Sequence, residues 1–208
     1  MKIGRTELEK QIVVVLFPLA NDVQESSLGV WTEIGPNSKE RINSIWYFDH
    51  SAWPSSRLVW LFSAGTDGKH SAGRTLAELG NEYVQQHFEY VSRYPDGNVV
   101  NHDNKVIFGT KPEFIWGMRE LLKLYPPNKY ILIVVMATQR RHMPRVKWIV
   151  KRYGPREVFF HFLITSQTKE LPFWRETLSW VKLYLGDGWL GKQVQRFRRS
   201  MTNSFDRA

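Results

Sequence analysis

The stretch from Ile131 to Arg145, ILIVVMATQRRHMPR, constrains the fold more than any other part of the sequence. Five of the six residues from Ile131 to Met136 are Ile, Leu or Val, and such a run is typical of a strand that is buried on both faces of a sheet. The residues that follow predict a loop and then a helix over 143–153. We therefore expect the strand over 129–137 at the centre of a sheet that is parallel over most of its strands.

Patterns typical of strands and of helices alternate along the rest of the chain. Further strands are expected at residues 11–17, 57–62, 99–106 and 156–165, and further helices at 38–50, 71–91, 110–124 and 173–185. Residues 18–36 predict a long polar loop. Strands that alternate with helices indicate an α/β fold with a parallel, doubly wound sheet. No repeat or linker interrupts the sequence, so we expect a single α/β domain over 1–208, with a basic amphipathic tail at 186–208.

The positive charge is concentrated in two segments. The net charge is +9, and residues 139–156 alone carry seven Lys and Arg side chains and no acid. Residues 192–199 carry four more Lys and Arg side chains. These eleven charges exceed the total of +9, so the other residues are close to balanced. The sequence therefore predicts two local basic patches on an otherwise balanced protein.

Composition excludes several classes of site. The sequence contains no cysteine, which rules out disulfides, thiol catalysis and cysteine-based zinc sites. It contains no zinc-protease spacing and no P-loop, and we expect no metal site. No signal peptide is recognisable at the N-terminus, and no segment approaches the roughly 20 apolar residues that cross a bilayer. We therefore expect a cytoplasmic protein without a transmembrane segment.

Several short segments stand where such a fold would place a ligand, at strand ends and helix starts. Ser63-Ala64-Gly65 follows a predicted strand and would let the backbone approach a ligand closely, although by itself the pattern favours a plain turn. Thr110 and Glu113 form a capping-box pattern with Thr110 at the N-cap, and that local role also suffices for them. Glu78 is equally compatible with a solvated helix residue, and His142 with a surface imidazole.

The start of the predicted helix over 143–153 is the best candidate for an anion site. A helix N-terminus presents unpaired N–H groups and a partial positive charge, and Arg140 and Arg141 add to that charge. Arg145 follows His142 by one turn on the same helix face and could hold a carboxylate or phosphate through two hydrogen bonds. His142 could donate a hydrogen bond or act as a general acid.

Together and in this order, these segments resemble the YdcF/SanA/ElyC-like family of bacterial proteins. Ser63-Ala64-Gly65 resembles the Ser-Gly-Gly loop of that family, with Ala in place of a Gly, and Glu78 resembles its helix Glu. Thr110 and Glu113 resemble its Asn-Thr-x-Glu-Asn element, with Gly109 and Phe114 where Asn is expected. Residues 138–145 match its Thr-Ser-x-x-His-x-x-Arg element well. The resemblance covers about residues 57–185.

The resemblance implies a Rossmann-like three-layer α/β sandwich with a site at the carboxyl ends of its strands. It further implies binding of S-adenosylmethionine and a role in envelope biogenesis. Together with the basic residues around His142, it leads us to expect a small-molecule binder or transferase that acts on an anionic, nucleotide-like ligand. The residues expected to be catalytic are His142, Glu78 and Glu113. The residues expected to bind the ligand are Ser63, Ala64, Gly65, Thr110, Thr138, Arg141 and Arg145.

Two other interpretations remain open. The basic patches at 140–156 and 192–199 are interleaved with aromatic residues such as Trp148, Tyr153 and Trp189, a combination typical of weak, sequence-independent nucleic-acid binding. Alternatively, the tail contacts an anionic membrane surface or a partner through apolar residues at three- or four-residue spacing. The same spacing would also let the tail pack on its own domain.

Overall fold

A computed structural model of the chain describes residues 10–19, 22–27, 30–47, 56–65, 74–88, 98–102, 109–165, 177–181 and 183. The chain divides into two compact units, residues 1–167 and 168–208. In the second unit, residues 177–181 and 183 are helical, as expected for the helix predicted there. The tail over 186–208 lies outside the described residues, and the expectation of a single domain stays a prediction.

Five parallel strands form the sheet of the first unit, in the order β5-β4-β1-β6-β7. Their bounds are Gln11–Pro18 for β1, Arg57–Phe62 for β4, Val99–Val100 for β5, Tyr130–Gln139 for β6 and Val158–Thr165 for β7. The parallel arrangement is therefore confirmed. β6 pairs with β1 on one side and β7 on the other, and it is buried from Ile131 to Gln139. It is an interior strand, as predicted, while β1 holds the middle position.

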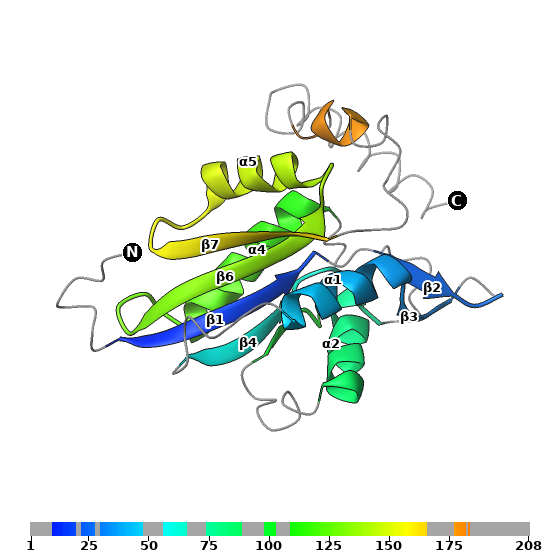
Figure 1. The fold of residues 1–208 in the computed structure, drawn as a ribbon, viewed down its shortest axis with the longest axis horizontal. Coiled ribbons are helices and arrows are strands. Elements are labelled where there is room, and N and C mark those ends of the chain that lie inside the picture. The colour runs from blue at the N-terminus through cyan, green and yellow to red at the C-terminus, as the bar shows by residue number, and fades with distance from the viewer. Residues whose placement is uncertain are drawn as a thin grey trace, which may run out of the picture. The chain divides into compact units, whose positions relative to one another are not determined.

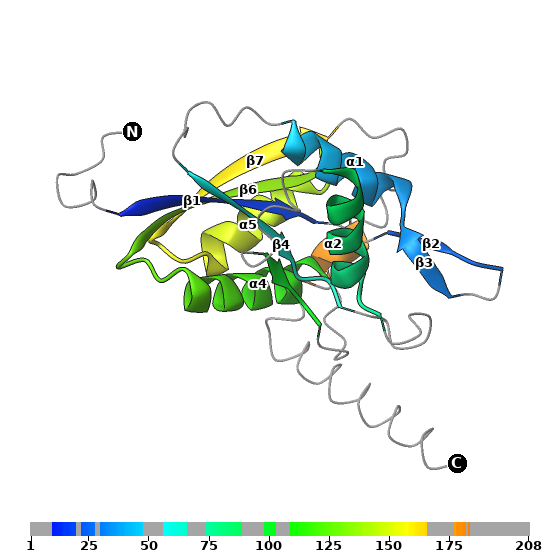
Figure 2. The same cartoon turned by 90° about the horizontal axis from the view of Figure 1, so that it is seen from below.

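Helices cover both faces of this sheet (Figures 1 and 2). On one face lie α1, Pro36–Trp46, which packs on β1, β6 and β7, and α2, Leu76–His87, which packs on β4 and β5. On the other face lie α4, Thr110–Leu124, and α5, Met143–Tyr153, which pack on each other and on β4 and β7. The result is a Rossmann-like three-layer α/β sandwich, and the predicted fold class is confirmed.

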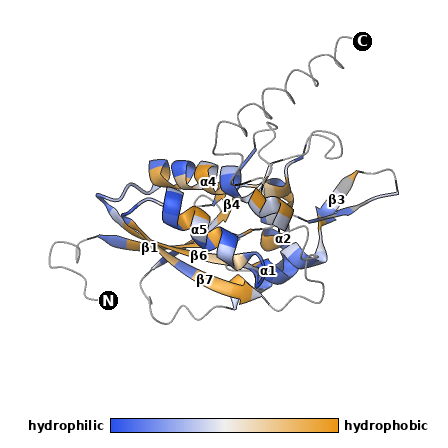
Figure 3. Cartoon of the chain, turned by 90° about the horizontal axis from the view of Figure 1, so that it is seen from above, coloured by the Kyte–Doolittle hydropathy of each residue, from blue (hydrophilic) through white to orange (hydrophobic). Residues whose placement is uncertain are grey.

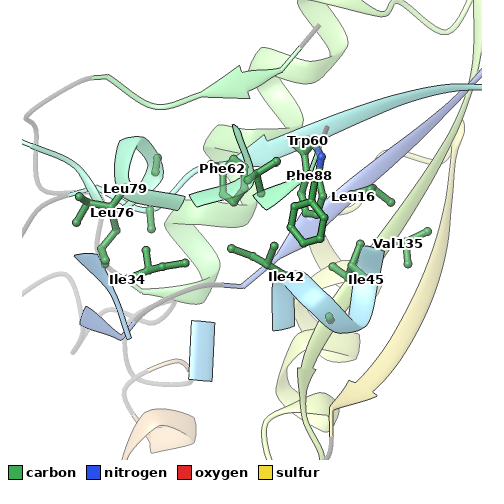
Figure 4. Close-up of a cluster of buried hydrophobic side chains, with 14 of the residues drawn as sticks. Leu16, Ile34, Ile42, Ile45, Trp60, Phe62, Leu76, Leu79, Phe88 and Val135 are labelled. Atoms are coloured by element: carbon green, nitrogen blue, oxygen red, sulfur yellow. The ribbon is translucent and has the colours of Figure 1, made fainter. Parts of the chain in front are cut away.

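A hydrophobic core cluster lies between the sheet and the helices α1 and α2 (Figure 4). Alternate residues of the strands point into it, because side chains of a strand alternate between the two faces of a sheet. Its centre is a set of aromatic rings. Trp60 stacks on Phe62 with ring centroids 5.7 Å apart, and on Trp46 with centroids 6.2 Å apart. Phe88, at the end of α2, packs against both tryptophans.

The segment over 18–36 is not the long polar loop that the sequence predicts. It contains an antiparallel pair of short strands, β2, Val23–Glu25, and β3, Trp31–Ile34. Ile34 is buried in the core cluster. Asp22 precedes the pair, and its carboxylate accepts hydrogen bonds from the backbone N–H groups of Asn37, 2.9 Å, and Ser38, 2.6 Å. The segment therefore caps the first turn of α1.

Most other predicted elements agree with the structure, and the differences lie at their ends. β4, α4 and α5 have the predicted bounds. α2 is shorter than the predicted helix over 71–91, because a capping box begins it at Thr75 and extended backbone at Phe88 ends it. α1 begins two residues early, and β7 begins at Val158 rather than at 156. β5 covers only residues 99–100; of the rest of its predicted range, 103–106 lie outside the described residues.

The hydropathy of the elements matches their places in the layers (Figure 3). The strands of the sheet are largely apolar, whereas the helices carry polar and apolar residues together (Figure 3). This is the expected pattern for a sheet that is covered on both faces by amphipathic helices. None of the helices in the described part of the chain combines the length and the apolarity that a bilayer crossing requires.

We predict that Gly80→Val in α2 destabilises the fold. A Cβ atom added to Gly80 would lie 2.8 Å from a ring carbon of Phe62, and that ring is held by its stack on Trp60. Overpacking of this kind typically costs about 1–3 kcal/mol. Urea denaturation measures the loss, and Gln85→Val, at an exposed position of the same helix, is the control. Equal stability of the two variants would contradict the close packing of α2 on β4.

Candidate functional site

The candidate site lies at the edge of the sheet where the parallel strands end. Ser63 follows β4, Asn101 follows β5, and Thr138 and Thr165 lie near the ends of β6 and β7. The helices α2, α4 and α5 begin at the same edge, as the right-handed crossovers of such a fold require. In open α/β sheets this edge is where ligands bind.

Three side-chain hydroxyls at this edge are buried without a hydrogen-bond partner among the described residues. They belong to Ser63, Thr138 and Thr165, which are 2%, 0% and 4% exposed. An unpaired buried polar group costs about 1–3 kcal/mol, and folded proteins leave few of them. β4, β6 and β7 therefore end in hydroxyls that still have hydrogen-bonding capacity.

Thr110, His142 and Arg145 form a hydrogen-bonded chain between α4 and α5. Arg145 Nη2 lies 2.6 Å from His142 Nδ1, and His142 Nε2 lies 3.0 Å from Thr110 Oγ1. A guanidinium group only donates hydrogen bonds, so Nδ1 is the acceptor. The imidazole is therefore neutral with its proton on Nε2, which donates to Thr110. The three predicted site residues are brought together, and in this arrangement His142 positions Thr110.

Glu113 lies in the first turn of α4 and is fully buried. Its Oε1 accepts a hydrogen bond from the backbone N–H of Gly109, 2.9 Å away. Burial raises the pKa of Glu113 to about 7, although the Gly109 hydrogen bond and the charges of Arg41 and Arg145 act in the opposite direction. The carboxyl group therefore changes its protonation near neutral pH.

The predicted N-cap of α4 is wrong by one residue. The N-cap is Gly109, with φ at 115°, and Thr110 is the first residue of the helix. The hydroxyl of Thr110 bonds to His142 instead of to its own helix, because a tertiary partner is available. A positive φ of this size suits glycine, which has no Cβ.

A narrow pocket connects Glu113 to the loop after β4. Its lining comes from the ends of β1 and β4 and from the first turns of α2 and α4, namely Pro18, Phe62, Ser63, Ala64, Leu76, Ala77 and Glu113. It contains about 190 Å³ of space free of atoms, including space open to solvent. This is below the range of about 300–1,000 Å³ of small-molecule sites. Within it, Ser63 and Glu113 are the polar groups.

Arg41 is a buried cation of this region that the sequence interpretation missed. It is 3% exposed, and its guanidinium donates a hydrogen bond to the carbonyl of Leu19, directly after β1. Burial lowers the pKa of Arg41, although the charges of Asp22, Glu113 and Glu40 act to raise it. Its burial could have been predicted from the sequence, because Arg41 lies beside Ile42 and one turn before Ile45, on the apolar face of α1.

Glu78 lies at the same edge but is occupied by local contacts. Its carboxylate accepts from the backbone N–H of Thr75, 2.8 Å away, and pairs with His102 at 2.9 Å. Burial acts to raise the pKa of Glu78, but the contacts with Thr75 and His102 outweigh it and the pKa lies below the ordinary value. A chain of hydrogen bonds from Thr75 through Asn101 reaches the carbonyl of Ser63.

The loop after β4 forms hydrogen bonds with α2 in addition to lining the pocket. The carbonyls of Ala64 and Gly65 accept hydrogen bonds from the N–H groups of Ala77, 3.0 Å, and Leu76, 3.2 Å. This loop therefore caps α2, while the side chain of Ala64 lines the pocket. Arg141 is exposed in the turn before α5. The catalytic and binding roles expected for these residues stay predictions.

The start of α5 does not offer the unpaired N–H groups that the sequence analysis expects there. The N–H groups of Met143, Arg145 and Val146 donate to the carbonyls of Arg140 and His142, and Pro144 has no N–H. The backbone N–H groups of this first turn are thus already hydrogen-bonded to carbonyls of the turn and of the residues just before it. Side chains must therefore supply the hydrogen bonds to an anion at this place.

Comparisons with known proteins identify no relative of this chain. No family model matches the sequence, no curated protein matches it, and no solved structure matches the fold. Among the residues that the structure describes, no three His, Asp or Glu side chains converge in a way that would hold a metal ion. The chemistry of the site must therefore be inferred from its own residues.

We predict that ionisation of Glu113 lowers the free energy of unfolding between about pH 4.5 and 7. Its folded pKa is about 7 and its ordinary value is 4.5, so between these values the folded state binds more protons than the unfolded state. Stability from this group is full below about pH 4.5 and is lost as the pH approaches 7. The loss is at most about 3 kcal/mol, at about 1.36 kcal/mol per pKa unit.

Glu113→Gln is the matched variant for this measurement. The amide oxygen keeps an acceptor for the N–H of Gly109 and removes the ionisation. Chemical denaturation at a series of pH values should show the wild-type protein losing stability relative to the variant as the pH rises through this window. Parallel pH profiles of the two proteins would show that Glu113 does not ionise in the folded state as described.

Proposed function

We propose that the carboxyl edge of the sheet binds an anionic, nucleotide-like small molecule. One observation carries the proposal: Ser63, Thr138 and Thr165 end three strands with buried hydroxyls that have no partner among the described residues. Such groups are normally satisfied by water or by a ligand. Of the three, Ser63 lines the pocket beside Glu113, and a hydroxyl, phosphate or carboxylate group of a ligand there would satisfy its hydroxyl.

The charges near these hydroxyls favour an anionic ligand. Arg41 and Arg145 are both close enough to Glu113 to influence its pKa. Protonation of Glu113 removes one negative charge that acts on both guanidinium groups, while Asp22 and Glu40 still act on Arg41. Arg145 is linked through His142 to Thr110, so its position is held by the protein before a ligand binds. Such preorganisation reduces the free energy that binding must spend on ordering side chains.

The site also contains a group suited to proton transfer. For a transferase reaction, Glu113 is the proton acceptor that we propose, because its pKa of about 7 lies close to neutral pH, where acid–base catalysis is most effective. His142 suits this role less well, since both of its ring nitrogens have protein partners. S-adenosylmethionine, which the family resemblance implies, is a first test ligand; it has an adenosine and a carboxylate, but its sulfonium and ammonium groups give it a net positive charge, so AMP and ATP are the anionic test ligands.

Isothermal titration calorimetry with S-adenosylmethionine, AMP, ATP and inorganic phosphate tests the proposal. Native mass spectrometry of the purified protein identifies any molecule that remains bound. Binding of an adenosine-containing anion with one site per chain is the expected result. Absence of binding by all four compounds, together with an empty protein in mass spectrometry, would overturn it.

We predict that Arg145→Ala abolishes binding of the anionic ligand and that Lys151→Ala has little effect. Arg145 lies in the first turn of α5 beside the site, whereas Lys151 is exposed near the other end of the same helix. Loss of a buried charged contact costs about 2–5 kcal/mol, and loss of an exposed charge costs far less. Calorimetry on both variants measures the difference. Equal losses of affinity in the two variants would show that the ligand interacts only with the overall positive charge of the helix.

We predict that Thr138→Val weakens ligand binding without destabilising the protein. Its hydroxyl is buried and unpaired among the described residues, and replacing such a group by a methyl of the same shape is close to neutral or stabilising. Thr75→Val is the control, because the Thr75 hydroxyl donates to Asn101 and accepts from Glu78. The control variant should lose about 1–3 kcal/mol of stability. Similar stability losses in both variants, in thermal denaturation without ligand, would contradict a free Thr138 hydroxyl.

A further inference from the structure

The outer side of α5 presents cations and aromatic rings together. The inner side of this helix, with Met143, Val146 and Ile149, is buried. The outer side and the neighbouring start of α4 form what we name the α5 surface, which consists of Lys111, Lys147, Trp148, Lys151, Arg152 and Tyr153. This surface does not include Arg145 or any residue of the pocket.

The rings and cations of the α5 surface contact one another. The guanidinium carbon of Arg152 lies 5.8 Å from the ring centre of Trp148 and 5.9 Å from that of Tyr153. Lys111 Nζ lies 4.7 Å from the ring centre of Tyr153. The rings of Trp148 and Tyr153 lie 6.2 Å apart at 69°. These contacts hold flat apolar groups and positive charges side by side across two helices.

No carboxylate interrupts this charge along the chain. Residues 139–156 contain no Asp or Glu, and the exposed cations there extend beyond the surface to Arg140, Arg141 and Arg156. The nearest acid that follows is Glu157, and Glu113 of α4 is buried. The charge is therefore suited to a polyanion that runs along the helix.

We infer that the α5 surface binds single-stranded nucleic acid without regard to its sequence. Cations that track a phosphate backbone, combined with rings on which unpaired bases stack, are the two components of such binding. A duplex would leave the rings unused, because its bases are already stacked. A membrane-surface helix needs an exposed apolar face, and the apolar face of α5 is buried in the fold.

This inference does not depend on the proposed small-molecule site. The α5 surface and the site use different residues, so a variant can impair one and leave the other intact. Arg145→Ala should reduce binding of the small ligand but leave oligonucleotide binding close to that of the wild type. The two proposals can therefore fail separately.

Fluorescence anisotropy of the full chain with a labelled oligothymidylate of about 20 nucleotides, titrated between about 50 and 200 mM salt, tests the inference. The variant that removes charge carries Lys147→Gln, Lys151→Gln and Arg152→Gln. If each side chain neutralises one phosphate, the slope of log affinity against log salt becomes shallower by about 2, at about 0.7 per phosphate. The control carries Arg119→Gln, Lys123→Gln and Lys129→Gln, which removes the same charge from exposed positions outside this surface.

The control variant should retain the wild-type slope. Trp148→Leu should weaken binding at least about fivefold through loss of stacking, with little change in the slope. Equal effects of the two charge variants would overturn the inference, because binding would then depend on net charge alone. So would binding of a duplex as tight as that of the single strand, or binding to phosphatidylserine vesicles without binding to the oligonucleotide. Unchanged binding in both charge variants would also overturn it and place the binding elsewhere on the chain.

Discussion

The structure depends on two adjacent strands that have no polar face. β1 is buried from Val13 to Pro18, and β6 from Ile131 to Gln139. Strands of this kind must be covered on both sides, and their parallel pairing requires helical crossovers that provide the cover. Because the five strands of this sheet then run in the same direction, their carboxyl ends and the starts of α2, α4 and α5 meet at one edge. The location of the candidate site is thus a consequence of how β1 and β6 are buried.

The sequence predicts the elements whose patterns are long and regular. β4, α4 and α5 have the expected bounds, since β4 contains a continuous apolar run and the apolar residues of the two helices recur at helical spacing. The strands β2 and β3 were not predicted because three or four residues are too few to show alternation. The N-cap of α4 was assigned to Thr110 because a local pattern cannot reveal that His142, on another element, takes its hydroxyl.

In the candidate site, too, the sequence identifies residues but not the contacts that they make with other elements. The sequence identifies Thr110, His142 and Arg145, which do lie together, but it does not reveal that Arg145 fixes the tautomer of the imidazole. It also misses Arg41 of α1, whose charge acts on Glu113. Nearby guanidinium groups ordinarily lower the pKa of a carboxyl group. Here burial outweighs both cations and raises the pKa of Glu113.

The strand order also has a consequence for how the chain acquires its structure during synthesis. Of the five strands of the sheet, β1 comes first in the chain, yet it pairs with β4 and β6, and its partner in β6 begins with Tyr130 opposite Gln11. At translation rates of about 5–20 residues per second, β1 waits roughly 6–24 s for that second partner. During this interval β1 is paired with another strand along one edge at most. The nascent chain therefore passes through a stage in which its central strand is open to chaperones and to wrong pairing.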